Sequence, residues 1–273
     1  MLFVILAATA TGLCTGVGAL PFVILRGVPR RLYDGLLGFG AGLMLSAATI
    51  GLLAHALGTV RPAAGPLHLG RLALVVGGFC GGFVILSLVE RLIPHEHAGG
   101  HREHLRHGGR REPEDDHGDH QAAHQRLGVA ISGALVFHRL PEGFAIGASF
   151  ATGETALLGG LVAIAVGLQN LCEGIVSAAP LRQGGVAPLK VLGWITATGL
   201  TTPVAAVLGY VFSRHIEGAL PFALALGAGS LISVTSNEII PETHSHGNET
   251  YATVGVVCGF LFTIVLRVVL GGD

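Results

Sequence analysis

The stretch Phe137-His138-Arg139-Leu140-Pro141-Glu142-Gly143 lies in the middle of an apolar run from about Leu127 to Ala151. A charged residue at the centre of a membrane helix costs about 2.5–3.5 kcal/mol, so such residues usually face the inside of a bundle and pair with one another, with water or with an ion. His138 and Glu142 are four residues apart and therefore share one helical face. Pro141 cannot donate a hydrogen bond to the carbonyl four residues earlier, which predicts a bend there. The stretch predicts a polar centre inside a membrane-spanning helix.

A second stretch, Gln169-Asn170-Leu171-Cys172-Glu173-Gly174, repeats this pattern inside the apolar run from about Thr155 to Ala179. Gln169 and Glu173 are again four residues apart. Two facing helices that each contribute an inward pair of N or O donors can build a metal site in a bundle core. Hydrogen bonding between helices is the alternative for a buried Gln or Asn in a membrane. Two matching pairs, both with glutamates, favour the metal site.

The composition of the chain points to a membrane protein. Of its 273 residues 51% are hydrophobic and 12% are charged, and the mean hydropathy is +0.66. A soluble domain of this size is less apolar, so we expect a polytopic membrane protein. The net charge of −1 gives no information about nucleic acid, but no basic patch exists outside the loops, so no nucleic-acid partner is expected. The four cysteines fall in four different apolar runs and indicate no disulfide framework.

Hydropathy predicts an all-α bundle of about eight transmembrane helices, because about eight apolar runs are long enough to cross some 30 Å of hydrocarbon. Residues 1–93 would hold the first three helices, and residues 127–273 would hold the other five and most of the polar centre. The predicted spans are approximately 1–25, 35–58, 70–93, 127–151, 155–179, 187–213, 219–241 and 250–270.

The segment 94–126 differs from the rest in composition. It holds eight of the fourteen histidines and almost no large apolar residue, so it cannot bury enough surface to fold alone, and we expect a disordered loop. It is either a solvated linker or a weak collector of metal ions, since neutral imidazole is a common ligand.

Lys and Arg orient the predicted bundle. With the N-terminus outside, eleven of these residues would lie on the cytoplasmic side and four on the outer side, with Arg139 inside the membrane. The positive-inside rule therefore favours extracytoplasmic termini and a cytoplasmic 94–126 loop.

The two motifs together resemble those of the ZIP (Zrt/Irt-like) divalent-metal transporters, whose usual forms are His-Asn-x-Pro-Glu-Gly and Gln-Asn/Asp-x-x-Glu-Gly. The stretch from Asn237 to His244 resembles a further signature of that family, and Ala41-Gly42-Leu43-Met44-Leu45 resembles its second span. The likeness covers nearly the whole chain.

The resemblance implies a primary metal site that unites residues from three spans. Mixed nitrogen, oxygen and sulfur ligands suit Zn²⁺, Cd²⁺, Fe²⁺ or Mn²⁺ better than Mg²⁺ or Ca²⁺, which prefer all-oxygen sites. The ion is cargo, and no catalytic cofactor is expected. The implied ligands are Met44, His138, Glu142, Gln169 and Glu173.

This chain departs from the family at the positions of a second ion. Many family members hold a second ion with the residue after the motif His, the residue after the motif Gln and a glutamate just before a proline in the sixth span. In this chain those three positions are Arg139, Asn170 and Thr202. A guanidinium is always charged and cannot ligate a metal. It can instead take the place of the second cation by pairing with Glu142 or Glu173, or it can block the site.

The seventh predicted span ends in acidic residues and histidines near the cytoplasmic face. Glu238 and Glu242 are four residues apart, with Pro241 between them. They are either acids at a water-exposed helix end or an exit route on which His244 and His246 receive the ion.

From these features we expect uptake of a divalent transition metal, most plausibly zinc, by a multi-pass protein of the plasma membrane. The resemblance also implies an elevator-like movement of one helix group against another, and a homodimer in the lipid bilayer. The rivals are a membrane-embedded metal-dependent hydrolase and a metal sensor that does not transport. The chain has no His-Glu-x-x-His or Gly-x-Ser-x-Gly motif, so we do not expect an enzyme.

Overall fold

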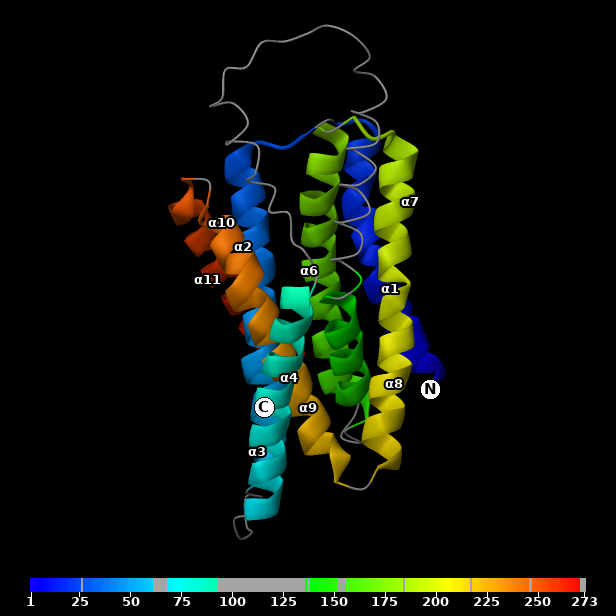
Figure 1. The fold of residues 1–273 in the computed structure, drawn as a ribbon, viewed down its shortest axis with the longest axis vertical. Coiled ribbons are helices and arrows are strands. Elements are labelled where there is room, and N and C mark those ends of the chain that lie inside the picture. Colours follow the sequence, from blue (N-terminus) through cyan, green and yellow to red (C-terminus); the bar gives the residue numbers. More distant parts are fainter. Residues whose placement is uncertain are drawn as a thin grey trace, which may run out of the picture.

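The computed structural model describes residues 1–25, 27–60, 68–92, 136, 138–151, 156–183, 185–216, 218–245 and 247–270. Within these ranges the regular elements are helices, and no strand occurs (Figure 1). Seven stretches of the described residues are long and apolar enough to cross a membrane. This confirms the predicted polytopic all-α bundle. The predicted span 127–151 is described only in its second half, where residues 138–150 form a helix, and the 94–126 segment lies outside the described residues.

The seven stretches agree with the predicted spans apart from small shifts of their ends. In chain order the main elements are α1 (Leu2–Ala19), α2 (Arg30–Ser46), α3 (Ala54–Gly58), α4 (Leu69–Leu92), α6 (Ala156–Gln183), α7 (Pro188–Gly199), α8 (Thr201–His215), α9 (Ala219–Val234), α10 (Ile240–Thr243) and α11 (Glu249–Val269).

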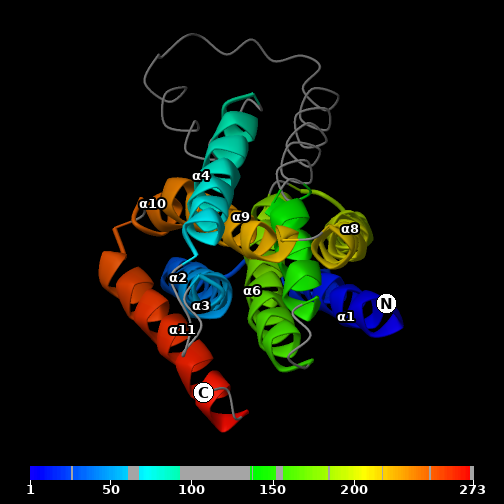
Figure 2. The ribbon, with the colours of Figure 1, turned by 90° about the horizontal axis from the view of Figure 1, so that it is seen from below.

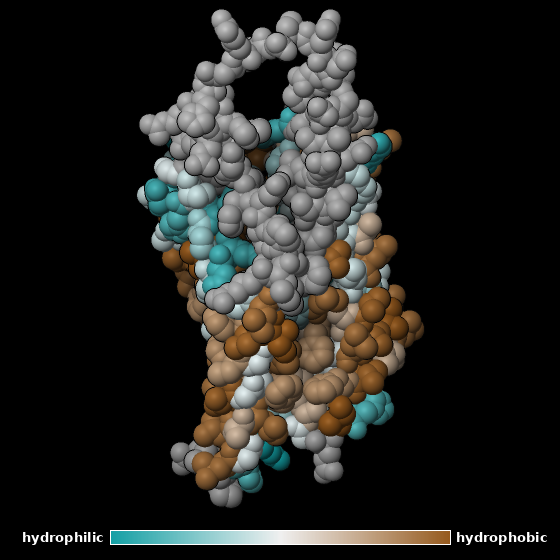
Figure 3. All heavy atoms as spheres, viewed as in Figure 1, coloured by the Kyte–Doolittle hydropathy of each residue, from teal (hydrophilic) through white to brown (hydrophobic). Residues whose placement is uncertain are grey.

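The outside of the bundle is apolar, as a protein in lipid requires. Large side chains such as Leu6, Leu208 and Val265 are more than half exposed. Figure 3 shows hydrophobic residues over much of the described surface, with hydrophilic residues towards its two ends. A soluble protein rarely exposes so much contiguous apolar surface.

The helices form two groups that lie side by side (Figure 2). Group I consists of α1, the 138–150 helix, α6, α7 and α8, and group II consists of α2, α3, α4, α9, α10 and α11. The most extensive contacts of α1 are with α6, those of α2 are with α11, and those of α4 are with α9. The two groups also meet along their boundary, where α2 packs against α6.

Glycines bring the helices of one group into backbone contact. In group I a Cβ at Gly143 would collide with the carbonyl oxygen of Thr202, and in group II a Cβ at Gly42 would collide with that of Val256. Between the groups the glycine contacts are looser but uneven: a Cβ at Gly51 would lie 3.7 Å from Val162 Cγ2, an ordinary contact, whereas a Cβ at Gly227 would lie 3.0 Å from Ala145 Cβ, a tight one. Small residues let membrane helices pack closely, and here they do so mainly within each group.

Three spans contain interruptions near the polar centre. The stretches Arg30–Gly58 and Ala219–Thr243 include π-helical turns, η2 (Ala47–Leu53) and η4 (Thr235–Ile239). This geometry is often found at functional sites. The stretch Pro188–His215 is divided into α7 and α8 at Leu200. Pro141 is part of the helix over residues 138–150, and the bend predicted there involves Phe137, which lies outside the described residues.

Candidate metal site

Arg139 lies at the centre of group I and joins the two motif helices. Its Nη1 atom lies 3.1 Å from Glu142 Oε2 on the same helix, and its Nη2 atom lies 2.6 Å from Glu173 Oε2 on α6. Arg139 has no exposed surface, and Glu142 is 1% exposed. A charged side chain buried in a membrane protein is stable only where opposite charges or hydrogen-bond partners compensate it. One guanidinium thus holds two carboxylates together inside the membrane.

Each carboxylate presents only its Oε2 oxygen to Arg139. Glu173 Oε2 also accepts a hydrogen bond of 3.1 Å from Gln169 Nε2, while Glu173 Oε1 lies 3.9 Å from His138 Nδ1. Glu142 Oε1 and Gln169 Oε1 are buried and have no hydrogen-bond partner within the described part of the chain. Buried polar atoms are rarely left without a partner. The Oε1 oxygens and the His138 imidazole are donors suited to a cation.

His138 connects group I to group II. Its Nε2 atom lies 2.8 Å from Glu238 Oε2 in η4. Sequence reasoning placed Glu238 on an exit route and not beside the primary ligands. The π-helical turn of η4 begins at Thr235 and carries Glu238. No local sequence signal indicates this contact, because it depends on how the two groups pack.

Met44 approaches the site from group II. One turn before it, a Cβ at Gly40 would lie 3.6 Å from Gln169 Cγ, so this face of α2 contacts α6 beside the site. Met44 is 2% exposed, and its sulfur lies 3.8 Å from Thr235 Oγ1. Thr235 is a neighbour that sequence reasoning missed, since a lone threonine in an apolar span gives no signal of its own.

The two other second-ion positions are also buried in group I. Asn170 Nδ2 donates a hydrogen bond of 3.0 Å to the carbonyl of Thr11 on α1, which orients the amide. Asn170 Oδ1 and Thr202 Oγ1 have no hydrogen-bond partner among the residues described, and the same is true of Arg139 Nε. Neither Asn170 nor Thr202 is exposed. A carboxylate that could bind a second ion is absent from both positions.

Of the expected ligands, His138, Gln169 and Glu173 are therefore neighbours and Glu142 is joined to them through Arg139, but they do not form a finished cage. In the residues that the structure describes, no group of three or more His, Cys, Asp or Glu side chains is arranged to hold a metal. The reason is visible in the contacts above: Arg139 takes one oxygen of each glutamate, and Glu238 takes His138. Neutral Gln169 and Met44 would supply the remaining donors.

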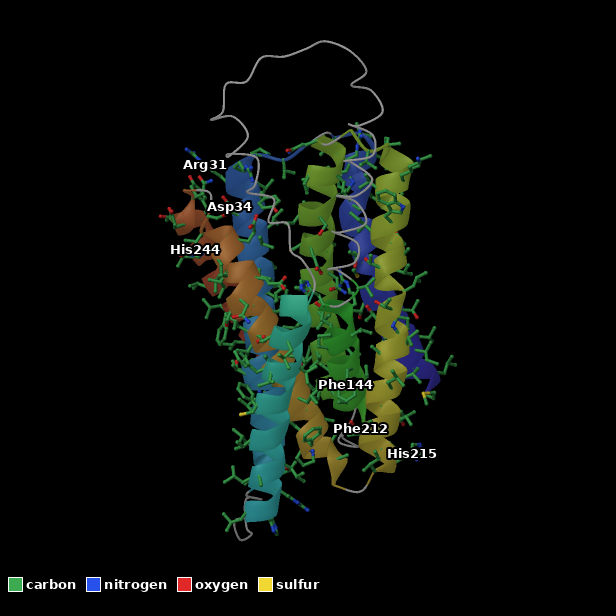
Figure 4. All side chains as sticks on the ribbon, in the orientation of Figure 1. Arg31, Asp34, Phe144, Phe212, His215 and His244 are labelled. Atoms are coloured by element: carbon green, nitrogen blue, oxygen red, sulfur yellow. The ribbon has the colours of Figure 1, made fainter. Side chains whose placement is uncertain are left out.

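Of the proposed exit residues, Glu238 lies at the polar centre beside His138, whereas His244 lies at one end of the molecule. Figure 4 shows His244 near Asp34 and Arg31 at the upper end, far from His215 at the lower end. His244 Nδ1 lies 2.7 Å from Thr243 Oγ1, and His244 Nε2 lies 3.2 Å from Thr253 Oγ1. Its ring thus links α10 to α11 in this state. Glu242 is half-buried in α10, and His246 lies outside the described residues.

Comparisons with known proteins identify the family of the chain. The family model described as ZIP zinc transporter matches residues 1–267. The chain is 33% identical over 270 residues to the zinc transporter ZIPB of Bordetella bronchiseptica, covering 98% of this chain and 82% of that protein. It is 31% identical to the zinc transporter GufA of Myxococcus xanthus, covering 98% of both. It is 28% identical to the human zinc transporter ZIP11, covering 95% of this chain and 94% of that protein.

Proposed function

The chain belongs to the ZIP zinc transporter family, and we propose that it moves zinc across the membrane through a single site in which Arg139 replaces a second metal ion. Transport of a divalent metal follows from the family. The single site and the role of Arg139 follow from residues in which this chain departs from the family pattern.

One observation carries the proposal: in each of the two glutamates, only the Oε2 oxygen contacts Arg139, and the Oε1 oxygen does not. Both Oε2 atoms contact the Arg139 guanidinium, whereas Glu142 Oε1 has no partner in the described chain and Glu173 Oε1 faces His138. Carboxylates that bridge two cations use their oxygens in this way. Arg139 would thus hold the place of one cation permanently, and the transported ion would bind on the Oε1 side.

Charge balance favours this division of the site. Two carboxylates and Arg139 carry a net charge of about −1, and one bound dication changes it to about +1, whereas two dications on the same carboxylates would leave about +2. Charges this deep in a membrane interact strongly because the surrounding dielectric is low. A tethered cation therefore keeps the glutamates close together without a second ion from solution.

The donor types favour zinc and its chemical relatives. The Oε1 oxygens, an imidazole and the Met44 thioether form a mixed set, which suits Zn²⁺ and Cd²⁺ and also accommodates Fe²⁺ or Mn²⁺. Mg²⁺ and Ca²⁺ prefer oxygen ligands alone. Binding requires His138 to leave Glu238, so the glutamate in η4 is well placed to receive the ion next and pass it towards Glu242 and His244.

Movement of group I against group II would expose the site alternately to the two sides. Four of the five proposed ligands belong to group I, and the looser contacts between the groups, such as that at Gly51, are compatible with sliding. We further propose that the protein resides in the plasma membrane as a homodimer, with extracytoplasmic termini and the 94–126 segment in the cytoplasm.

A transporter is favoured over the hydrolase and the sensor, because the matched relatives are named as zinc transporters. The proposal is tested by zinc influx into proteoliposomes with wild-type protein, Arg139→Asn, and Arg214→Asn as a control at an exposed arginine. We expect influx with the wild type and the control, and slower influx with Arg139→Asn, because the glutamates then repel each other. Influx only with Arg139→Asn would mean that the arginine blocks the site.

A further inference from the structure

A cavity of about 230 Å³ lies between the two helix groups, away from the metal site. Its walls come from η2, α3 and α11 of group II and from the first half of α6 in group I. None of the proposed metal ligands lines it. The cavity therefore needs an explanation of its own.

The cavity has a polar end and an apolar interior. His55 and Arg267 lie near the ends of their spans, at the same side of the bundle as Leu157, the first residue of its span. Deeper in the membrane the lining is apolar and includes Ala47 and Val162. Ala47 lies eight residues before His55, which corresponds to roughly 12 Å along a helix. The cavity thus begins at the depth of lipid headgroups and extends into the hydrocarbon region.

Neither water nor a metal ion fits this lining. A cavity of this size could hold several water molecules of about 30 Å³ each, but each water needs two to four polar partners, and the walls are mostly apolar. A cation would meet the positive charge of Arg267. The Nη1 atom of Arg267 donates a hydrogen bond of 2.8 Å to the carbonyl of Ile50 in η2, which fixes the guanidinium at the polar end.

We propose that the cavity binds one acyl chain of an anionic phospholipid, whose phosphate lies beside Arg267 and His55. Arginine is the side chain best suited to phosphate oxygens, and basic sites between membrane helices select anionic headgroups. Because group I and group II both line the cavity, the bound chain contacts both and controls how readily one moves against the other. This control of movement rests on the proposed function, whereas the binding itself does not.

Binding is tested by native mass spectrometry of the full-length protein incubated with phosphatidylglycerol. Arg267→Gln should lower the retained lipid about fivefold, the factor for losing one arginine from an anionic lipid site, and Arg267→Lys should retain it. Leu158→Trp, which fills the cavity and leaves Arg267 in place, should also lose lipid. Arg71→Gln is the matched control, because Arg71 is exposed, donates to the carbonyl of Thr59 and does not line the cavity. Wild-type retention by either Arg267→Gln or Leu158→Trp would overturn the proposal.

Control of movement is tested by zinc influx into vesicles of phosphatidylcholine with and without phosphatidylglycerol. Wild type and Arg71→Gln should respond to phosphatidylglycerol, and Arg267→Gln and Leu158→Trp should lose that response. An equal response from all four proteins, or none from the wild type, would overturn the regulatory role. A complete lack of influx in both kinds of vesicle would instead contradict the proposed function, and the mass spectrometry would still decide the lipid site.

Discussion

Group I and group II are both apolar helical units closed by glycine contacts, but they differ in what they bury. Group I encloses Arg139, Glu142 and Asn170 with no more than 1% exposure each, and the charges among them compensate one another. Group II contributes Met44 and Glu238 from beside its π-helical stretches. Group I therefore carries a pre-assembled charge cluster, and in the proposed mechanism group II supplies the surface against which that cluster moves.

Glu142→Gln should have the largest effect on this cluster. It removes one of the two carboxylates that compensate Arg139, and breaking a buried ion pair costs about 3–5 kcal/mol. It also removes a ligand, so we expect zinc influx to fall by about 100-fold. Proteoliposome influx and thermal unfolding would measure both effects. Glu249→Gln, at an exposed acid in the first turn of α11, is the control, and transport by Glu142→Gln at the control rate would show that the cluster is not the site.

Glu238→Gln tests the link from group II to His138. In the proposed route Glu238 releases His138 and receives the ion next, so we expect influx to fall by about 10-fold, a typical loss when a neighbour of a metal ligand is removed and less than for Glu142→Gln. The protein should remain folded, because Arg139 keeps both partners. An influx defect as large as that of Glu142→Gln would place Glu238 among the primary ligands.

Glycine substitutions test the difference between contacts within and between groups. Gly42→Ala places a Cβ against the carbonyl of Val256 inside group II, and such overpacking costs typically 1–3 kcal/mol. Gly51→Ala faces Val162 across the groups at 3.7 Å and should leave stability nearly unchanged. Thermal unfolding in detergent compares the two. Equal destabilisation would mean that the groups are packed as tightly against each other as within themselves.

Met44→Leu should have the smallest effect. The two side chains have similar volumes, so stability should change by less than about 1.5 kcal/mol. Loss of the soft thioether should reduce cadmium influx more than zinc influx. Competition between the two metals in one influx assay measures that ratio. An unchanged ratio would show that Met44 only packs.

Much of this arrangement could be predicted from the sequence, because hydropathy identifies spans and a four-residue spacing places His138 and Glu142, or Gln169 and Glu173, on one face. The expectation that Arg139 pairs with these glutamates also follows from charge alone. Which oxygens it takes could not be predicted, nor that Glu238 meets His138, since both depend on packing between distant helices. The π-helical stretches leave no pattern in the residue types, and Thr235 is recognised only by its position beside Met44.

The central claim is that Arg139 stands in for one of two ions, and it is tested most directly by counting zinc ions bound to the purified full-length protein. The double variant His138→Ala with Glu142→Ala provides the number of ions bound elsewhere, including at the 94–126 histidines. The account predicts that the wild type binds one ion more than this variant, and that Arg139→Asn combined with Thr202→Glu binds two more. Two additional ions in the wild type, with Arg139 in place, would contradict it.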